Sequence, residues 1–138
     1  MFGLTDLWLV STRISEIAFG KAICPNLQRL YIYDCEGLAE VGTLPDTLME
    51  LELWDCLDLE NIEAFCGLAK LQMLTILNCP KVEQFFGLGT LKCLDTLEIY
   101  KCGVTVILGL QQPTKIRVLK VSRCNALEEL QLILGQLF

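Results

Sequence analysis

Residues 27–35 read LQRLYIYDC, and this pattern of leucines ending in a cysteine returns four more times along the chain. The further copies are LMELELWDC at 48–56, LQMLTILNC at 71–79, LDTLEIYKC at 94–102 and IRVLKVSRC at 116–124. Their cysteines, Cys35, Cys56, Cys79, Cys102 and Cys124, follow one another at steps of 21, 23, 23 and 22 residues. A sustained period of this length indicates a solenoid, in which each repeat stacks on the next and shares one core with it.

The repeats cover nearly the whole chain. A degenerate first copy lies upstream, where Leu4, Leu7 and Leu9 hold the leucine places and Thr12 stands in the place of the cysteine, 23 residues before Cys35. We therefore expect one domain over residues 1–138, built of about six repeats on a continuous core. Solenoids normally carry polar end repeats. Neither end of this sequence has the pattern of such a polar end repeat, so the domain is expected to be uncapped.

Short strands are expected where leucines alternate with other residues, since side chains along a strand point to opposite faces with a period of two. The expected strands are 6–10, 29–33, 50–54, 73–77, 96–100 and 118–122, forming one parallel sheet of about six strands on a concave side. Pro25, Pro45 and Pro113 stand two or three residues before an inward aliphatic residue and break helices there. The convex side is therefore expected to hold loops and short 3-10 or extended turns.

The candidate functional residues are those that the same period turns outward, at the third, fifth, seventh and eighth places of each copy. Both tryptophans and all three tyrosines of the chain stand at the fifth or seventh place, whereas all six phenylalanines lie outside the strands. Aromatic residues with a polar group are favoured at protein recognition surfaces. The predicted partner-binding residues are Trp8, Tyr31, Tyr33, Glu50, Glu52, Trp54, Asp55, Leu77, Glu98, Tyr100 and Lys120.

A structural explanation of the same columns stays open. Tyrosine and tryptophan are good strand residues, and stacked aromatic columns stabilise a sheet without binding anything. That explanation accounts for the strand positions but not for the exclusion of phenylalanine, which has a similar strand preference.

The ladder cysteines share one place in successive repeats, so we expect their thiols to point inward and in parallel. Parallel side chains about 4.8 Å apart are poorly aimed for disulfides, which predicts small buried thiols bonded to loop carbonyls and a reducing compartment. Three further thiols, Cys24, Cys66 and Cys93, lie outside the ladder and are expected to be partly exposed. The chain has no CxxC and no zinc-type spacing, so no metal site is predicted.

Composition excludes several classes of function. The chain has no histidine, so a catalytic Ser/His/Asp or Cys/His arrangement cannot form within it, and neither an enzyme nor a cofactor is expected. A formal net charge of -6 argues against nucleic acid as a partner. Hydrophobic residues make up 53% of the chain, but no stretch reaches the roughly 20 apolar residues of a membrane span. The amino terminus lacks the basic start of a signal peptide.

The phrase LxxLxLxxCxxLxxL, preceded by LPxxLxxL at 44–51, resembles the leucine-rich repeats of plant intracellular nucleotide-binding leucine-rich-repeat (NLR) disease-resistance receptors. The resemblance covers roughly residues 20–137. It implies an α/β solenoid in the form of a right-handed horseshoe, and recognition of pathogen effectors or host proteins in the cytoplasm during plant innate immunity. The chain carries no P-loop, so nucleotide binding is not implied.

Two alternatives to partner recognition remain from the sequence. The first is a structural or self-associating module that forms a homo-oligomer through open terminal repeats, which charges placed at Leu7 or Leu134 would disrupt. The second is the substrate-reading part of a ubiquitin-ligase adaptor, a family that also uses cysteine-bearing repeats.

Overall fold

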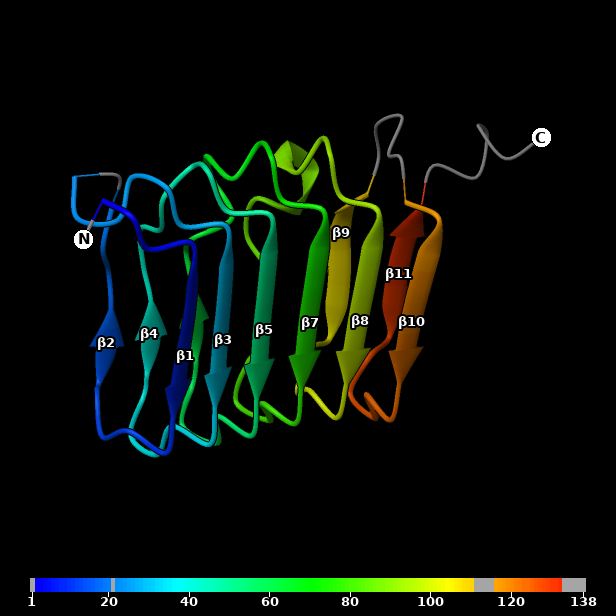
Figure 1. The fold of residues 1–138 in the computed structure, drawn as a ribbon. Helices are drawn as coiled ribbons and strands as arrows, with labels where there is room; N and C mark the ends of the chain where they lie inside the picture. The colour runs from blue at the N-terminus through cyan, green and yellow to red at the C-terminus, as the bar shows by residue number, and fades with distance from the viewer. Residues whose placement is uncertain (1, 21, 111–115, 133–138) are drawn as a thin grey trace.

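The computed structural model describes residues 2–20, 22–110 and 116–132 of the chain. Its largest element is a six-stranded parallel sheet with the strand order β1-β3-β5-β7-β8-β10 (Figure 1). The strands are β1 (Asp6–Val10), β3 (Arg29–Tyr33), β5 (Glu50–Trp54), β7 (Met73–Leu77), β8 (Thr96–Tyr100) and β10 (Val118–Ser122). These are the bounds expected from the alternation of leucines, so the predicted strands are confirmed.

The strands pair without slipping, because each place in a repeat lies opposite the same place in the next repeat. Leu30, for example, pairs with Leu7 on one side and with Leu51 on the other. The inward residues of the four central strands are at most 1% exposed: Leu30, Ile32, Leu51, Leu53, Leu74, Ile76, Leu97 and Ile99. Burying one aliphatic side chain contributes about 1.5–3 kcal/mol, so these ladders are a major source of stability.

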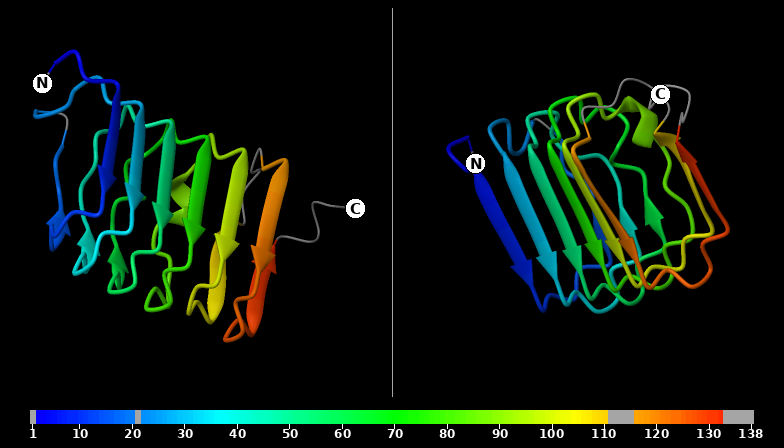
Figure 2. Two further views of the ribbon diagram at one scale, coloured as in Figure 1. Left: turned by 60° about the horizontal axis from the view of Figure 1, so that its bottom comes forward. Right: turned by 90° about the vertical axis from the view of Figure 1, so that its right-hand side faces the viewer.

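A second layer lies behind this sheet and returns the chain to the start of the next repeat (Figures 1 and 2). It holds two small parallel sheets, β2-β4-β6 and β11-β9, and one 3-10 helix, η1. The bounds are β2 (Glu16–Ile17), β4 (Glu40–Val41), β6 (Asn61–Ile62), η1 (Leu88–Thr90), β9 (Val106–Leu110) and β11 (Glu129–Leu132). The sequence predicted only loops and short turns here, so these small sheets are an addition.

The fold is therefore a parallel-sheet β-solenoid of about five turns, and η1 is the one helix among the described residues. The solenoid prediction is confirmed at this level. The α/β class, the right-handed horseshoe curvature and the single-domain assignment stay predictions. Pro113 and Leu134 lie outside the described residues.

Each strand of the main sheet is followed directly by a residue with left-handed backbone, a feature that the sequence did not predict. Six non-glycine residues have φ between 51° and 55°: Ser11, Asp34, Asp55, Asn78, Lys101 and Arg123. All stand at the eighth place, directly before the cysteine or, for Ser11, before Thr12. This conformation is unfavourable for most side chains and least so for asparagine and aspartate. It turns the chain sharply so that the next residue can point into the core.

Candidate interaction face

The face of the six-stranded sheet that points away from the core, here called the outer face, carries a continuous row of four aromatic rings. Trp8 and Tyr31 stack with ring centroids 4.8 Å apart. The Tyr31 and Tyr33 centroids are 6.3 Å apart, and those of Tyr33 and Trp54 are 5.1 Å apart. Trp8 is 55% exposed and Trp54 is 40% exposed. This aromatic row, Trp8, Tyr31, Tyr33 and Trp54, thus crosses three strands and ends in a solvent-facing tryptophan at each side.

Two carboxylates of β5 hold the tyrosines of the aromatic row in place. The Tyr31 hydroxyl donates to Glu50 Oε2 at 2.7 Å, and the Tyr33 hydroxyl donates to Glu52 Oε2. In both pairs the acceptor lies one strand across and two places earlier in the repeat, a diagonal that long side chains can span. Burial, helped by the bond to Glu50, raises the pKa of Tyr31 to about 12. The same two causes, with Glu52 as acceptor, raise the pKa of Tyr33.

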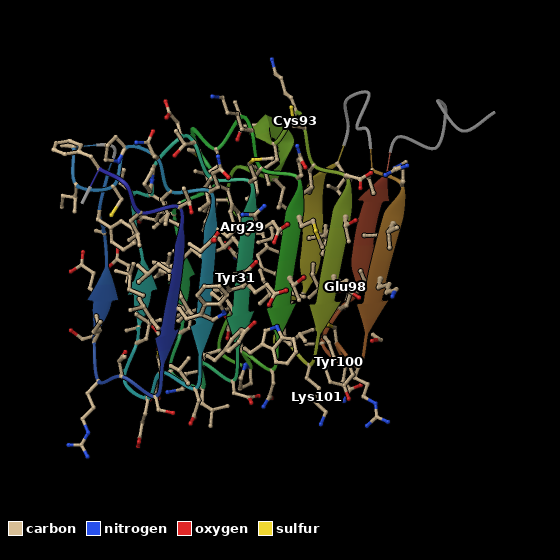
Figure 3. The ribbon with its side chains drawn as sticks, in the orientation of Figure 1. Arg29, Tyr31, Cys93, Glu98, Tyr100 and Lys101 are labelled. Atoms are coloured by element: carbon tan, nitrogen blue, oxygen red, sulfur yellow. The ribbon has the colours of Figure 1, made fainter. Side chains whose placement is uncertain are left out.

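Arg29 joins the edge strand to this network. Its Nη1 lies 3.0 Å from Asp6 Oδ1, and its Nε lies 3.8 Å from Glu50 Oε1. Arg29 lies beside Tyr31 on β3 (Figure 3). An exposed ion pair adds little stability by itself, but one guanidinium between two carboxylates orients the Glu50 that holds Tyr31.

A second group of candidate residues lies on β8 and β10. Lys120 Nζ is 3.3 Å from Glu98 Oε1. Two cations lie over the Tyr100 ring, Lys101 Nζ at 5.5 Å and the Arg123 guanidinium carbon at 5.9 Å from its centroid. Figure 3 shows Glu98 and Tyr100 on β8, with Lys101 at the end of that strand. This part of the face is cationic at the carboxyl ends of the strands.

The structure therefore brings nine of the eleven predicted site residues into two groups. Six of them form the aromatic row and its carboxylates: Trp8, Tyr31, Tyr33, Glu50, Glu52 and Trp54. Leu77 lies in register between Trp54 and Tyr100 and separates the groups. Asp55 points along the strand ends instead, where its Oδ1 accepts a bond from Asn78 Nδ2 at 2.9 Å. Arg29, Lys101 and Arg123 were absent from the predicted site, although each stands at an outward place.

Four of the five ladder thiols are buried, as predicted, whereas Cys124 is partly exposed. Cys35, Cys56 and Cys79 are fully buried, and each is bonded to the carbonyl oxygen two residues before it, at 3.5–3.6 Å. All eight cysteines are free. Burial raises the pKa of Cys102 to about 11, which keeps its thiol protonated and unreactive at neutral pH.

The three thiols outside the ladder differ from one another. Cys66 and Cys93 are exposed, as expected, and Cys93 lies at the edge where the strands begin (Figure 3). The prediction for Cys24 is wrong, because its side chain is only 3% exposed and belongs to the hydrophobic core beside the first strands.

Among the described residues, no group of three or more His, Cys, Asp and Glu side chains is placed to hold a metal ion. No helix in the described part of the chain is long and apolar enough to cross a membrane. No protein-family model, curated protein or solved structure matches this chain.

Proposed function

We propose that this chain is a non-catalytic recognition module that binds a polypeptide partner on its outer face. The aromatic row carries the proposal. Tyrosine and tryptophan supply large contact area with few rotatable bonds, and they dominate the binding energy of many interfaces. Stacking within the sheet accounts for the ring contacts, but Trp8 is still 55% exposed. A large apolar side chain that served stability alone would be expected to be more fully buried.

The bonds from Tyr31 and Tyr33 to Glu50 and Glu52 support the same proposal. A ring that is held in one orientation before binding loses less conformational freedom when a partner covers it. The rings are thus presented as a rigid surface on a sheet, where sites are held more firmly than on loops.

The finer proposal is a leucine-rich-repeat horseshoe that recognises an effector or a host protein in plant innate immunity, inside the cytoplasm. Its support is the repeat phrase itself, together with the inward thiols, which suit a reducing compartment. The absence of histidine supports the non-catalytic part of the proposal. Self-association and a ubiquitin-ligase adaptor role stay predictions.

A photo-crosslinking experiment tests the proposal. A benzophenone amino acid is placed at position 54 in the aromatic row, and in a matched sample at Ile23, an exposed residue between β2 and β3. A partner crosslinked at position 54 is purified, and its affinity is measured for the Tyr33→Ala and Trp54→Ala variants. Because hot-spot aromatics cost at least about 2 kcal/mol on truncation, binding should weaken roughly 30-fold. Ile23→Ala should leave it unchanged, and unchanged affinity in folded Tyr33→Ala and Trp54→Ala would refute the proposal.

A further inference from the structure

The second layer is split between the third and fourth repeats, although the six-stranded sheet in front of it is continuous. A ladder of backbone bonds joins the second-layer segments at one equivalent place. Ala39 N donates to Ser15 O at 2.9 Å, and Glu60 N donates to Ala39 O at 3.0 Å. Farther along, Thr105 N donates to Glu83 O at 3.2 Å, and Glu128 N donates to Thr105 O at 2.8 Å. The bond that would join residue 83 to residue 60 is missing among the described residues.

The split leaves β6 with an unpaired edge. Ile17 O and Val41 O, at the equivalent place in the two earlier repeats, accept from Gly42 N at 2.7 Å and from Glu63 N at 2.9 Å. In β6 the same place is Ile62 O. No described residue donates to Ile62 O or to Glu60 O. These are alternate carbonyls on one side of a strand, the acceptors that a parallel partner strand uses.

The size of one side chain explains why the split lies here. Phe85 stands six places after its ladder cysteine, where the earlier repeats have Val41 and Ile62. Its ring packs against the buried Phe65 with centroids 6.3 Å apart. A phenyl ring needs more depth than the aliphatic side chains of β4 and β6, so we attribute the lost pairing to this substitution of ring for aliphatic group.

A pocket of about 420 Å³ opens at the split, within the size range of small-ligand sites. It is lined by β6 and its neighbours on one side and by residues 81–86 on the other, and three carboxylates, Glu60, Glu63 and Glu83, contribute to its wall. Phe86, which is 60% exposed, adds an apolar surface. The wall is therefore rich in hydrogen-bond acceptors beside one aromatic ring.

The lining offers little charge to neutralise these carboxylates. Its one cation among the described residues, Lys81, has Nζ 3.0 Å from Asp58 Oδ1. The hydrogen bond from Lys81 also lowers the pKa of Asp58, and the Lys81 ammonium interacts with Glu60 more weakly. Since the described residues hold no metal-type cluster, a compact cation such as Mg²⁺ is not the natural occupant.

We propose that the split is a docking site for an extended, arginine-bearing segment of a partner polypeptide, which adds to the free edge of β6. Its main-chain N–H groups meet the carbonyls of Glu60 and Ile62, the mode of recognition called β-strand addition. Its guanidinium groups meet the carboxylates of Glu63 and Glu83 and stack on Phe86. This site lies on the opposite layer from the aromatic row and does not depend on the function proposed for that row.

Fluorescence anisotropy with short labelled peptides tests the proposal. The probe is Val-Arg-Val-Arg-Val, compared with Val-Glu-Val-Glu-Val and with a Val-Arg-Val-Arg-Val peptide whose backbone nitrogens are methylated. We expect the unmethylated arginine peptide to bind and the other two to bind at least about tenfold more weakly, because one lacks the charge and the other the donors. Absence of binding, or equal binding of the methylated peptide, would overturn strand addition.

Two variants with the same change in charge locate the site. Glu63→Gln with Glu83→Gln alters the pocket, whereas Glu16→Gln with Glu36→Gln removes two exposed carboxylates elsewhere. The pocket pair should weaken binding about tenfold, and the control pair should change it little. Equal losses of peptide affinity in the two double variants would show that the peptide is attracted by the overall negative charge of the protein, and would overturn the proposal. Trp54→Ala should leave peptide binding intact, and loss of binding in that variant would assign the peptide to the aromatic row instead.

Discussion

Gly103→Ala is expected to destabilise the protein because this glycine lies directly against the backbone of the preceding repeat. A Cβ atom added at Gly103 would come less than 3.0 Å from the carbonyl oxygen of Pro80, whereas ordinary contact begins at 3.4 Å. Pro80 follows Cys79 as Gly103 follows Cys102, so the clash joins equivalent places of two stacked repeats. Gly103 does not have positive φ, so lack of space and not backbone strain makes alanine unfavourable.

The size of the stability loss follows from how far the two stacked repeats must move apart. The two backbones have to separate by more than the few tenths of an ångström that a tight contact can absorb, and overpacking of this kind costs about 1–3 kcal/mol. The upper part of that range applies, because the obstructing atom belongs to the backbone and cannot swing away. Alanine also reduces the freedom of the unfolded chain, which offsets about 0.4–1 kcal/mol. The expected net loss is about 2 kcal/mol, or roughly 6 °C in Tm for a domain of this size.

Urea and thermal unfolding, followed by circular dichroism, measure this loss. Gly20→Ala is the matched control, since the nearest atom to its added Cβ is Thr43 Cγ2 at 3.9 Å. The control should be neutral or stabilising, by up to about 1 kcal/mol. Equal stability of the Gly103→Ala and Gly20→Ala variants would refute the packing of successive repeats described above.

Three further predictions concern other parts of the fold. Ser11→Asn should stabilise by about 0.5 kcal/mol in urea unfolding, since asparagine tolerates left-handed backbone and its amide can donate to Asp34 as the Ser11 hydroxyl does at 3.1 Å; a loss of stability would contradict this. The pKa of Tyr31 is raised from 10.0 to about 12, so folding favours the protonated phenol. Stability should therefore fall as pH rises from about 10 to 12. The fall should be less steep in Tyr31→Phe, and an equal fall in that variant would contradict the assignment to Tyr31. A thiol reagent should modify Cys66 and Cys93 quickly in the native protein, the partly exposed Cys124 more slowly, and the four buried ladder thiols only on unfolding. Rapid reaction of Cys35, Cys56, Cys79 or Cys102 would contradict the burial of the ladder.

The main sheet could be predicted from the sequence because its signal is both periodic and redundant. Inward leucines set the period of two, and the cysteines mark the same place in every repeat, so a shift of one residue would have exposed a whole ladder. Leu30 and Leu51 thus pair as expected. The outward residues followed from the same register.

Other features could not be read from the pattern because they depend on three-dimensional fit. The left-handed place is filled by residues as different as Ser11 and Arg123, so residue type did not mark it. The diagonal bonds from Tyr31 and Tyr33 depend on the rotamers of side chains in neighbouring repeats. The split in the second layer had one visible signal, the phenylalanine at position 85 where earlier repeats have an aliphatic residue, and its effect required knowing how deep the core is there.

The constant register of the six strands has a consequence for how this protein can change in length. The strands begin at steps of 21 to 23 residues, yet no pair among them slips. The return segments of the second layer therefore take up every difference in repeat length. An insertion of one residue there leaves the outer face in phase, whereas the same insertion within a strand would exchange the inward and outward sets. Whole repeats can thus be duplicated or removed, by evolution or by design, with the remaining surface kept in alignment.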